Sequence, residues 1–130
     1  MVRNTQTHPT HLLVTDDNRE FRESLCEGLR RRGFHTHAAS DGLEALSLLE
    51  SLRVDMLITD VHMPRLDGLR VLSEIRKLSQ PLPCILMSAE LDELLIARAA
   101  ELQAASVLAK PFTLSKIAAA IDEILASRDC

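Results

Sequence analysis

Five polar side chains lie directly after short apolar runs of the sequence. Asp16 and Asp17 follow the first run, and Asp60, Ser88 and Lys110 each follow a later one. Carboxylates that come close together repel one another and raise each other's pKa values unless a cation relieves the repulsion. Oxygen ligands at short range suit a hard cation that keeps several waters. Mg2+ is therefore the ion expected beside the three aspartates.

The same residues suit the transfer of a phosphoryl group. Asp17 and Asp60 are the expected direct ligands of Mg2+, and Asp16 is expected to act partly through water. A carboxylate beside the ion can attack phosphorus as a nucleophile. Lys110 and Ser88 would then stabilise negative charge on the phosphoryl oxygens, with an ammonium group and a hydroxyl donor. The expected acceptor is Asp60, because it ends a run that is typical of a strand buried on both faces.

Each of these groups also has an ordinary structural interpretation. The pair Asp16 and Asp17 can cap a helix, Ser88 can belong to a turn, and Lys110 can be a surface charge. Any one of these interpretations is plausible by itself. The occurrence of all of them at successive strand ends favours the chemical interpretation.

Five short apolar runs predict the strands that position these side chains. In the second run, Phe34, Thr36 and Ala38 alternate with His35 and His37, which is typical of an edge strand. The sequence places no carboxylate or thiol with the two histidines, so it does not favour a metal site there. The runs cover residues 11–15, 34–39, 54–59, 84–87 and 106–109.

Amphipathic segments between the runs predict five helices. Strands that alternate with helices indicate the α/β class, here a single doubly wound five-stranded parallel sheet with helices on both faces. The helices are expected over residues 18–32, 41–52, 69–78, 90–102 and 114–127. They belong to one domain, residues 10–128, which follows a polar and flexible tail, residues 1–9.

Charge and hydropathy exclude several functions. The net charge of the 130 residues is −4, and the one basic run, 30–32, lies where a helix should end and where cations complement its dipole. The sequence therefore lacks the basic surface of a nucleic-acid-binding domain. It also shows no signal peptide and no apolar run long enough for a membrane span. We expect a cytoplasmic protein that contacts neither nucleic acid nor membrane.

Five short segments resemble the receiver domain of bacterial two-component response regulators. The resemblance extends over about residues 10 to 127, and the segments that carry it are residues 15–17, 59–64, 67–68, 87–89 and 110–112. It implies a flavodoxin-like sheet of strand order 2-1-3-4-5. It also implies Mg2+ bound by Asp17, Asp60 and the backbone carbonyl of His62, with Ser88 and Lys110 in contact with the phosphoryl group.

The resemblance further implies the partners. Asp60 would accept the phosphoryl group from a histidine kinase or a histidine phosphotransfer protein. Its phosphorylation would switch a surface around the fourth helix, the fifth strand and the fifth helix. That surface would act on a downstream protein or on an output domain that this sequence does not include. Such a domain is not a conventional enzyme, because it catalyses only its own phosphorylation and dephosphorylation.

Two other functions compete with this interpretation. An aspartate-nucleophile phosphohydrolase needs a second carboxylate two residues after the nucleophile, but His62 occupies that position here. It also needs an inserted cap over a small substrate, and the sequence has none. A receiver fold that serves only as a protein-interaction scaffold, without phosphorylation, is the other alternative. The intact acidic set, Ser88 and Lys110 argue against it.

Three features of the sequence depart from the usual receiver pattern. The mildest is Ser88, at a position where threonine is also common. Val107 stands where receivers usually carry an aromatic residue that rotates on activation, and Ala104 and Ala105 replace the usual Gly-Ala before the last strand. Valine is short and stiff about χ1, so we expect Val107 to stay nearly unchanged on activation. The conformational change on activation would then consist of a movement of Ser88 and of the loop that leads into the fourth helix.

The fourth helix has more apolar residues than one core-facing stripe requires. Some of them must therefore face solvent or a partner, unless the helix is buried more deeply than usual. Leu91 and Leu95, four residues apart, are the expected outward pair.

Overall fold

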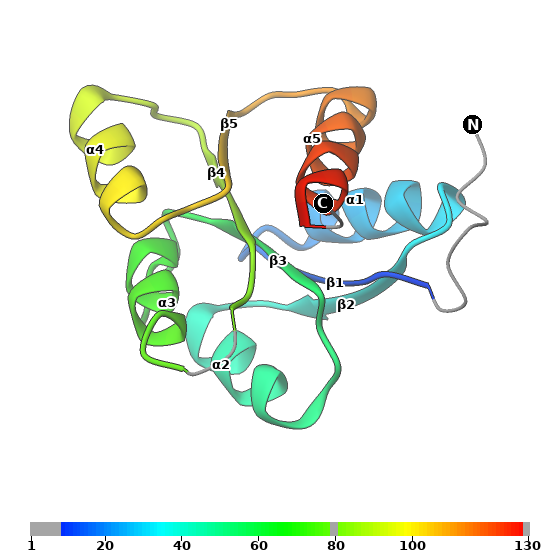
Figure 1. The fold of residues 1–130 in the computed structure, drawn as a ribbon, viewed down its shortest axis with the longest axis horizontal. Coiled ribbons are helices and arrows are strands. Elements are labelled where there is room, and N and C mark those ends of the chain that lie inside the picture. Colours follow the sequence, from blue (N-terminus) through cyan, green and yellow to red (C-terminus); the bar gives the residue numbers. More distant parts are fainter. Residues whose placement is uncertain (1–8, 79–80, 129–130) are drawn as a thin grey trace.

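The computed structural model describes residues 9–78 and 81–128, and its centre is a five-stranded parallel sheet. The order of the strands is β2-β1-β3-β4-β5, so the predicted α/β architecture and strand order are confirmed (Figure 1). The expected N-terminal tail lies outside the described residues except for Pro9. The strands are β1 (His11–Thr15), β2 (His35–Ala39), β3 (Met56–Asp60), β4 (Cys84–Ser88) and β5 (Ser106–Ala109).

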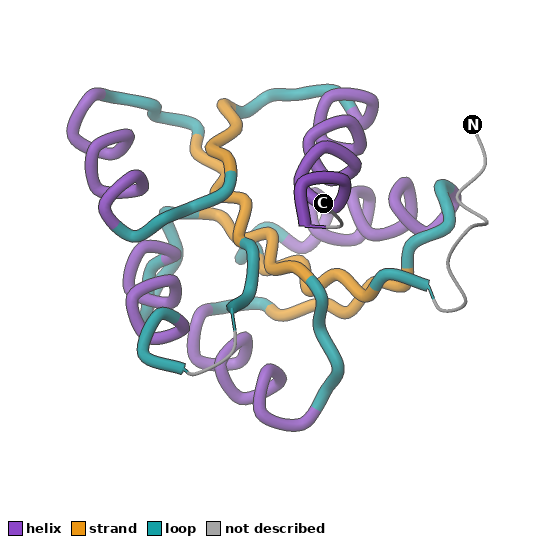
Figure 2. The backbone as a smooth tube through the Cα atoms, viewed as in Figure 1, coloured by secondary structure: helices purple, strands orange, loops and turns teal. Residues whose placement is uncertain are grey.

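Helices cover both faces of this sheet, as the sequence predicts (Figure 2). Two of them, α1 and α5, pack on one face, and the other three pack on the opposite face. No helix in the described part of the chain is long and apolar enough to cross a membrane. The helices are α1 (Arg19–Arg31), α2 (Gly42–Ser51), α3 (Gly68–Ile75), α4 (Glu93–Glu101) and α5 (Leu114–Arg128).

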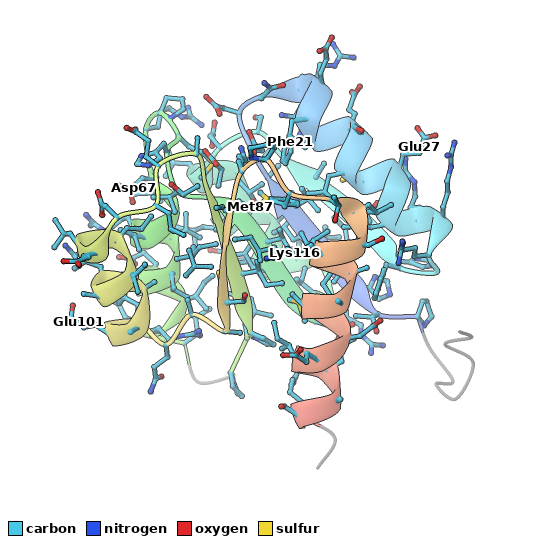
Figure 3. The ribbon with its side chains drawn as sticks, turned by 90° about the horizontal axis from the view of Figure 1, so that it is seen from above. Phe21, Glu27, Asp67, Met87, Glu101 and Lys116 are labelled. Atoms are coloured by element: carbon cyan, nitrogen blue, oxygen red, sulfur yellow. The ribbon has the colours of Figure 1, made fainter. Side chains whose placement is uncertain are left out.

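The alternation of side chains along the strands divides the core into two layers. On β1, Leu12 packs toward α1 and α5, whereas Leu13 packs toward α2, α3 and α4. Ile58 and Leu57 alternate in the same way on β3, and all four side chains are fully buried. Side chains fill the space on both sides of the sheet in the view from above (Figure 3). The central strands are therefore buried on both faces. Packing against both layers holds these strands, and with them their carboxyl ends, in place.

Polar caps determine where the helices begin. The side chains of Asn18, Asp41, Asp67 and Asp92 each accept a hydrogen bond from a backbone N–H in the first turn of α1, α2, α3 and α4, respectively. These bonds satisfy N–H groups that have no partner within the helix. The Asp92 cap starts α4 at Glu93, three residues later than the sequence indicates.

The prediction that Leu91 and Leu95 both face outward is wrong for Leu95. Leu95 is 7% exposed and packs into the core, while Leu91 is 41% exposed and precedes the helix. The large apolar side chains of α4 that face solvent are those of Leu94, 72% exposed, and Ile96, 49% exposed. Six of the nine residues of α4 are apolar, although only Leu95 and Ala99 are buried, so the surplus of apolar residues does not by itself identify the outward pair.

Candidate functional site

The strand ends bring the acidic side chains together at one edge of the sheet. Because β1 and β3 pair in parallel, with Thr15 opposite Thr59, the residues that follow them emerge side by side. A carboxylate oxygen from each of Asp16, Asp17 and Asp60 lies within 4.8 Å of the others. In the sheet, β2 lies on one side of β1 and β3 lies on its other side. The direction in which successive strands are added therefore reverses between β1 and β3. Crevices at such reversals are where open α/β sheets bind ligands.

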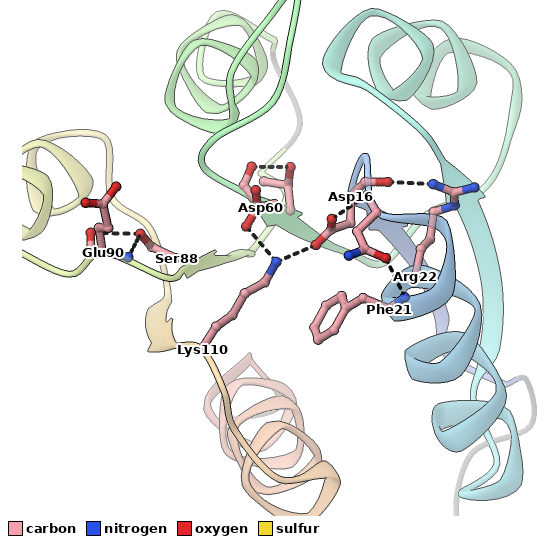
Figure 4. A network of polar contacts seen from close by, with 9 residues as sticks. Asp16, Phe21, Arg22, Asp60, Ser88, Glu90 and Lys110 are labelled. Carbon is pink, nitrogen blue, oxygen red and sulfur yellow. Dashed lines mark hydrogen bonds and ion pairs between the residues drawn. The ribbon is translucent and has the colours of Figure 1, made fainter.

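Lys110 connects two of these carboxylates. Its Nζ lies 2.7 Å from Oδ2 of Asp16 and 2.9 Å from Oδ1 of Asp60 (Figure 4). The lysine reaches them from the end of β5, where its backbone N–H donates to the carbonyl of Ser88. The same ammonium lies 4.3 Å from the centre of the Phe21 ring, at cation–π distance.

Burial and charge act in opposite directions at this ion pair. Burial raises the pKa of the Asp60 carboxyl above its ordinary value, Asp16 and Asp17 raise it further, and Lys110 opposes them. Burial lowers the pKa of Lys110, but hydrogen bonds to Asp16 and Asp60 outweigh burial and raise it overall. Lys110 therefore stays cationic, and its charge favours the ionised form of Asp60, which is the form that a nucleophile needs.

Asp16 and Asp17 have different surroundings although they are adjacent. Asp16 is 1% exposed, and its Oδ1 accepts the backbone N–H of Asn18 at 2.9 Å. Its carbonyl oxygen accepts a hydrogen bond from Arg22 Nη1 at 2.6 Å. Asp17 is exposed. Asp16 is thus fixed by the protein, while Asp17 presents its carboxylate to solvent.

The loop after Asp60 is held close against the strand end. The backbone N–H of Gly68 donates to the carbonyl of Val61 at 2.9 Å, and Val61 donates in turn to Met87 at 2.9 Å. A side chain at position 68 would collide with the carbonyl oxygen of Asp60, so only glycine fits there. His62 lies in this loop and its side chain is exposed.

Ser88 ends β4 at the same edge, but its hydroxyl does not contact the carboxylates. Ser88 Oγ donates to the carbonyl of Glu90 at 2.8 Å and accepts the backbone N–H of Glu90 at 3.0 Å. Figure 4 shows this contact on the far side of Ser88 from Asp60 and Lys110. The structure therefore gathers Asp16, Asp17, Asp60 and Lys110, and leaves Ser88 beside them with its hydroxyl engaged elsewhere.

Sequence reasoning did not connect two α1 residues with this site. Phe21 supplies the ring near Lys110, and its edge meets Phe112 with ring centres 5.9 Å apart. Arg22 binds the backbone of Asp16. The periodicity of α1 places Phe21 on the apolar stripe, and nothing in that pattern shows that its ring lies beside Lys110, which follows β5.

Comparison with known proteins agrees with this geometry. The family model of the response regulator receiver domain matches residues 12–122. The response regulator MprA of Mycobacterium sp. (strain KMS) is 39% identical over 119 residues, which is 90% of this chain and 51% of that protein. The chain thus spans about half the length of such curated relatives.

Solved structures with the same fold include two whose described function is informative. The signal receiver domain of an HD domain-containing protein from Pseudomonas fluorescens Pf-5 superposes with a TM-score of 0.87 at 28% identity, covering 94% of this chain and 98% of that one. A response regulator protein from Burkholderia pseudomallei, solved with a phosphorylated aspartic acid, calcium ion and citrate, gives 0.80 at 27% identity, covering 92% and 72%. By its family match, its relatives and its acidic site, the chain belongs to the response regulator receiver domain family.

Proposed function

We propose that this receiver domain accepts a phosphoryl group on Asp60 from a histidine kinase or a histidine phosphotransfer protein, in a reaction that requires Mg2+. The observation that carries the proposal is the position of the Lys110 ammonium, which contacts Asp60 at 2.9 Å within a cluster of three aspartates. Lys110 pairs with Asp16 and Asp60, so a single ammonium lies beside a cluster of three carboxylates. Like charges at this separation are costly without a cation.

The carboxylate of Asp60 is the nucleophile in this reaction. One carboxylate oxygen forms a bond to phosphorus while the bond from phosphorus to the donor's histidine nitrogen breaks. Lys110 already touches Oδ1 of Asp60, so its charge lies next to the oxygens that the phosphoryl group brings. The Ser88 hydroxyl would join them only after it leaves the backbone of Glu90. Positioned charges of this kind supply most of the catalysis in phosphoryl transfer.

The donor set fits a hard divalent cation. It consists of carboxylate oxygens, and Asp17 faces solvent, so waters have access to the site. We assign Mg2+ to Asp16, Asp17, Asp60 and the backbone carbonyl of His62. When bound, the ion would neutralise negative charge on the carboxylates and on the phosphoryl oxygens. The Burkholderia pseudomallei relative, with its phosphorylated aspartic acid and calcium ion, supports this assignment by analogy.

Phosphorylation of Asp60 would switch a partner-binding surface formed by α4, β5 and α5. Leu94 and Ile96 are exposed there, beside the loop that Ser88 begins. The curated relatives are about twice as long as this chain, so the target is either an additional domain or a separate protein. We place this activity in the cytoplasm, within a two-component pathway, and without direct contact of this domain to nucleic acid or membrane. The domain would catalyse only its own phosphorylation and dephosphorylation.

Mass spectrometry tests the acceptor. Incubation with acetyl phosphate and Mg2+ should add one phosphoryl group to the wild-type protein and none to Asp60→Asn. Asp67→Asn is the matched control, since it changes an aspartate of the same loop and asparagine also caps helices well. An adduct of equal yield on Asp60→Asn would contradict the assignment. A folded wild-type protein that stays unmodified with both acetyl phosphate and a histidine phosphodonor would favour a non-phosphorylated scaffold.

Thermal unfolding tests the ion. Binding to the folded state alone stabilises it by RT ln(1 + [L]/Kd), which is about 2.7 kcal/mol at a hundredfold excess over Kd. Asp17→Asn should weaken this stabilisation, whereas Asp67→Asn should keep it. Asp17→Asn also removes one of the mutually repelling charges, so we expect it to be at least as stable as the wild type without metal. A melting temperature that does not change from zero to tens of millimolar Mg2+ would argue against the site.

A further inference from the structure

Three histidines gather at the opposite end of the sheet from the acidic site. His11 begins β1, and His35 and His37 lie on β2, the neighbouring edge strand. The Nδ1 atom of His11 is 3.1 Å from Nε2 of His37. The two rings are stacked at an interplanar angle of 11°, with centres 5.4 Å apart. The ring of His35 is also close to that of His11, at 4.7 Å between centres and an interplanar angle of 46°.

Strand pairing fixes this arrangement. His11 is directly opposite His35 in the parallel register of β1 and β2, and His37 lies two residues farther along the same strand. Residues two apart on a strand point to the same face, so all three rings share one face of the sheet. The backbone of His11 is also held on its other side, because its N–H donates to Asp55 Oδ2 at 2.8 Å and its carbonyl accepts from the Asp55 N–H at 2.8 Å.

The separation of the two nitrogens matches that of two ligands on one metal ion. Tetrahedral Zn2+ with Zn–N bonds of about 2.0–2.1 Å sets neighbouring ligand nitrogens about 3.3 Å apart. Square-planar coordination, which Cu2+ and Ni2+ prefer, brings nitrogens at similar bond lengths to about 2.9 Å. The observed 3.1 Å between His11 and His37 falls between these values.

We propose that His11 and His37 bind a divalent cation that prefers imidazole nitrogen, of the class of Zn2+, Ni2+ and Cu2+, through Nδ1 and Nε2 respectively. His35 is exposed, so its ring can turn to become a third ligand, and water completes the coordination. The site is separate from the acidic cluster, because β1 is five residues long and spans about 13 Å at 3.3 Å per residue. The ligands also differ in kind, since nitrogen attracts borderline metals and carboxylate oxygen attracts Mg2+.

Without metal, the same two nitrogens form a hydrogen bond. One neutral ring donates its N–H and the other accepts it. Metal binding moves that proton to the second nitrogen of the donor ring, so both facing nitrogens present lone pairs and no net proton is released. Histidine tautomers thus distinguish a metal site from a histidine pair that serves only the packing of the strands.

Calorimetric titration of the tag-free protein with ZnCl2 tests the proposal. Several millimolar Mg2+ is kept present to occupy the acidic cluster. We expect one Zn2+ per chain and at least tenfold weaker binding in both His11→Gln and His37→Gln. The other two histidines of the chain supply matched controls, and His8→Gln and His62→Gln should bind Zn2+ like the wild type. Circular dichroism checks that each variant is folded.

A second measurement keeps the proposal testable if a variant folds poorly. Nitrogen-15 spectra of the wild-type imidazoles should show Nδ1 of His11 and Nε2 of His37 changing on Zn2+ addition, with the ring nitrogens of His62 unchanged. Three results would overturn the proposal: no Zn2+ binding by the wild type up to millimolar concentration, unchanged binding by His11→Gln and His37→Gln, or loss of binding only in His8→Gln. None of them depends on whether Asp60 is phosphorylated.

Discussion

The hydroxyl of Ser88 is held by the backbone of Glu90, to whose carbonyl it donates and from whose N–H it accepts. Both bonds lie within the loop that leads from β4 to the Asp92 cap of α4. A phosphoryl group on Asp60 offers charged oxygens, and hydrogen bonds to charged acceptors are about twice as strong as neutral ones. We therefore expect a phosphoryl group on Asp60 to draw the Ser88 hydroxyl away from Glu90 and so to change the path of this loop.

Ser88→Ala should uncouple the loop from Asp60. In the wild type, we expect beryllofluoride to shift the backbone amide resonances of Ala89 and Glu90, because the Ser88 hydroxyl leaves the backbone of Glu90. These shifts should largely disappear in Ser88→Ala and remain in Ser88→Thr, which keeps a hydroxyl. Two-dimensional NMR of the three proteins makes the comparison. Equal shifts in wild type and Ser88→Ala would show that the loop responds by another route.

Val107 should take little part in the same response. It lies opposite Leu86 in the pairing of β4 and β5, and its side chain is partly buried. A ligand moves an equilibrium only through contacts that differ between the two states, and a valine methyl offers few. We expect its methyl resonances to keep one rotamer with and without beryllofluoride, and Val107→Ala to preserve the loop shifts. A rotamer change at Val107 while the loop stays still would contradict this.

Arg76→Met should destabilise the fold by about 2–4 kcal/mol. A well-formed hydrogen bond from a charged group is worth about 1.5–3 kcal/mol, and the three bonds of Arg76 together give less than three times that value because solvent reaches them. The guanidinium donates to the carbonyls of Leu102, Leu82 and Gln103 at 2.8, 3.1 and 3.0 Å. It thereby joins the end of α3 to the end of α4. Urea denaturation measures the change, and Arg70→Met is the control.

The control loses only an exposed ion pair. Arg70 contacts Glu74 at 3.5 Å with 65% of its side chain exposed, so its removal should change stability by less than about 0.5 kcal/mol. Equal losses for Arg70→Met and Arg76→Met would show that the three carbonyl contacts contribute no more than a surface charge does.

Gln103→Gly should stabilise the protein by about 0.5–1 kcal/mol, because left-handed backbone costs a residue with Cβ about 1–2 kcal/mol. Gln103 has a φ of 60° and follows the last turn of α4, where Ala104 donates to Ala99 and Gln103 to Ala100. Glycine is the usual residue at this position of such a helix end. Gln103→Ala keeps the Cβ and should show no gain in the same urea experiment.

The acidic site could be predicted because its members lie at strand ends. Carboxyl ends of parallel strands share an edge, so Asp16, Asp60 and Lys110 meet whatever the details of the loops. The direction of the Ser88 hydroxyl was not predictable, because it depends on a loop conformation that brings Glu90 back over it. The missing glycine before β5 was recognised, but the residue that takes the left-handed conformation is Gln103, one position earlier.

The histidine cluster shows a different limit. His35 and His37 were recognised as a pair on one strand face, but their neighbour His11 is 24 and 26 residues away in the sequence. Only the register between β1 and β2 brings it into contact, and the sequence does not give that register. Leu95 shows a third limit, since the choice between apolar stripes of α4 depends on how the helix packs against the sheet.

The contact between Asp16 and Lys110 joins positions 94 residues apart. A ribosome makes the aspartates first and the lysine long afterwards, so the growing chain carries the acidic cluster without its counter-charge until β5 has been made. The site therefore cannot be completed in a nascent chain before nearly the whole domain has been synthesised. Chains cut short before Lys110 lack the ammonium that contacts Asp60.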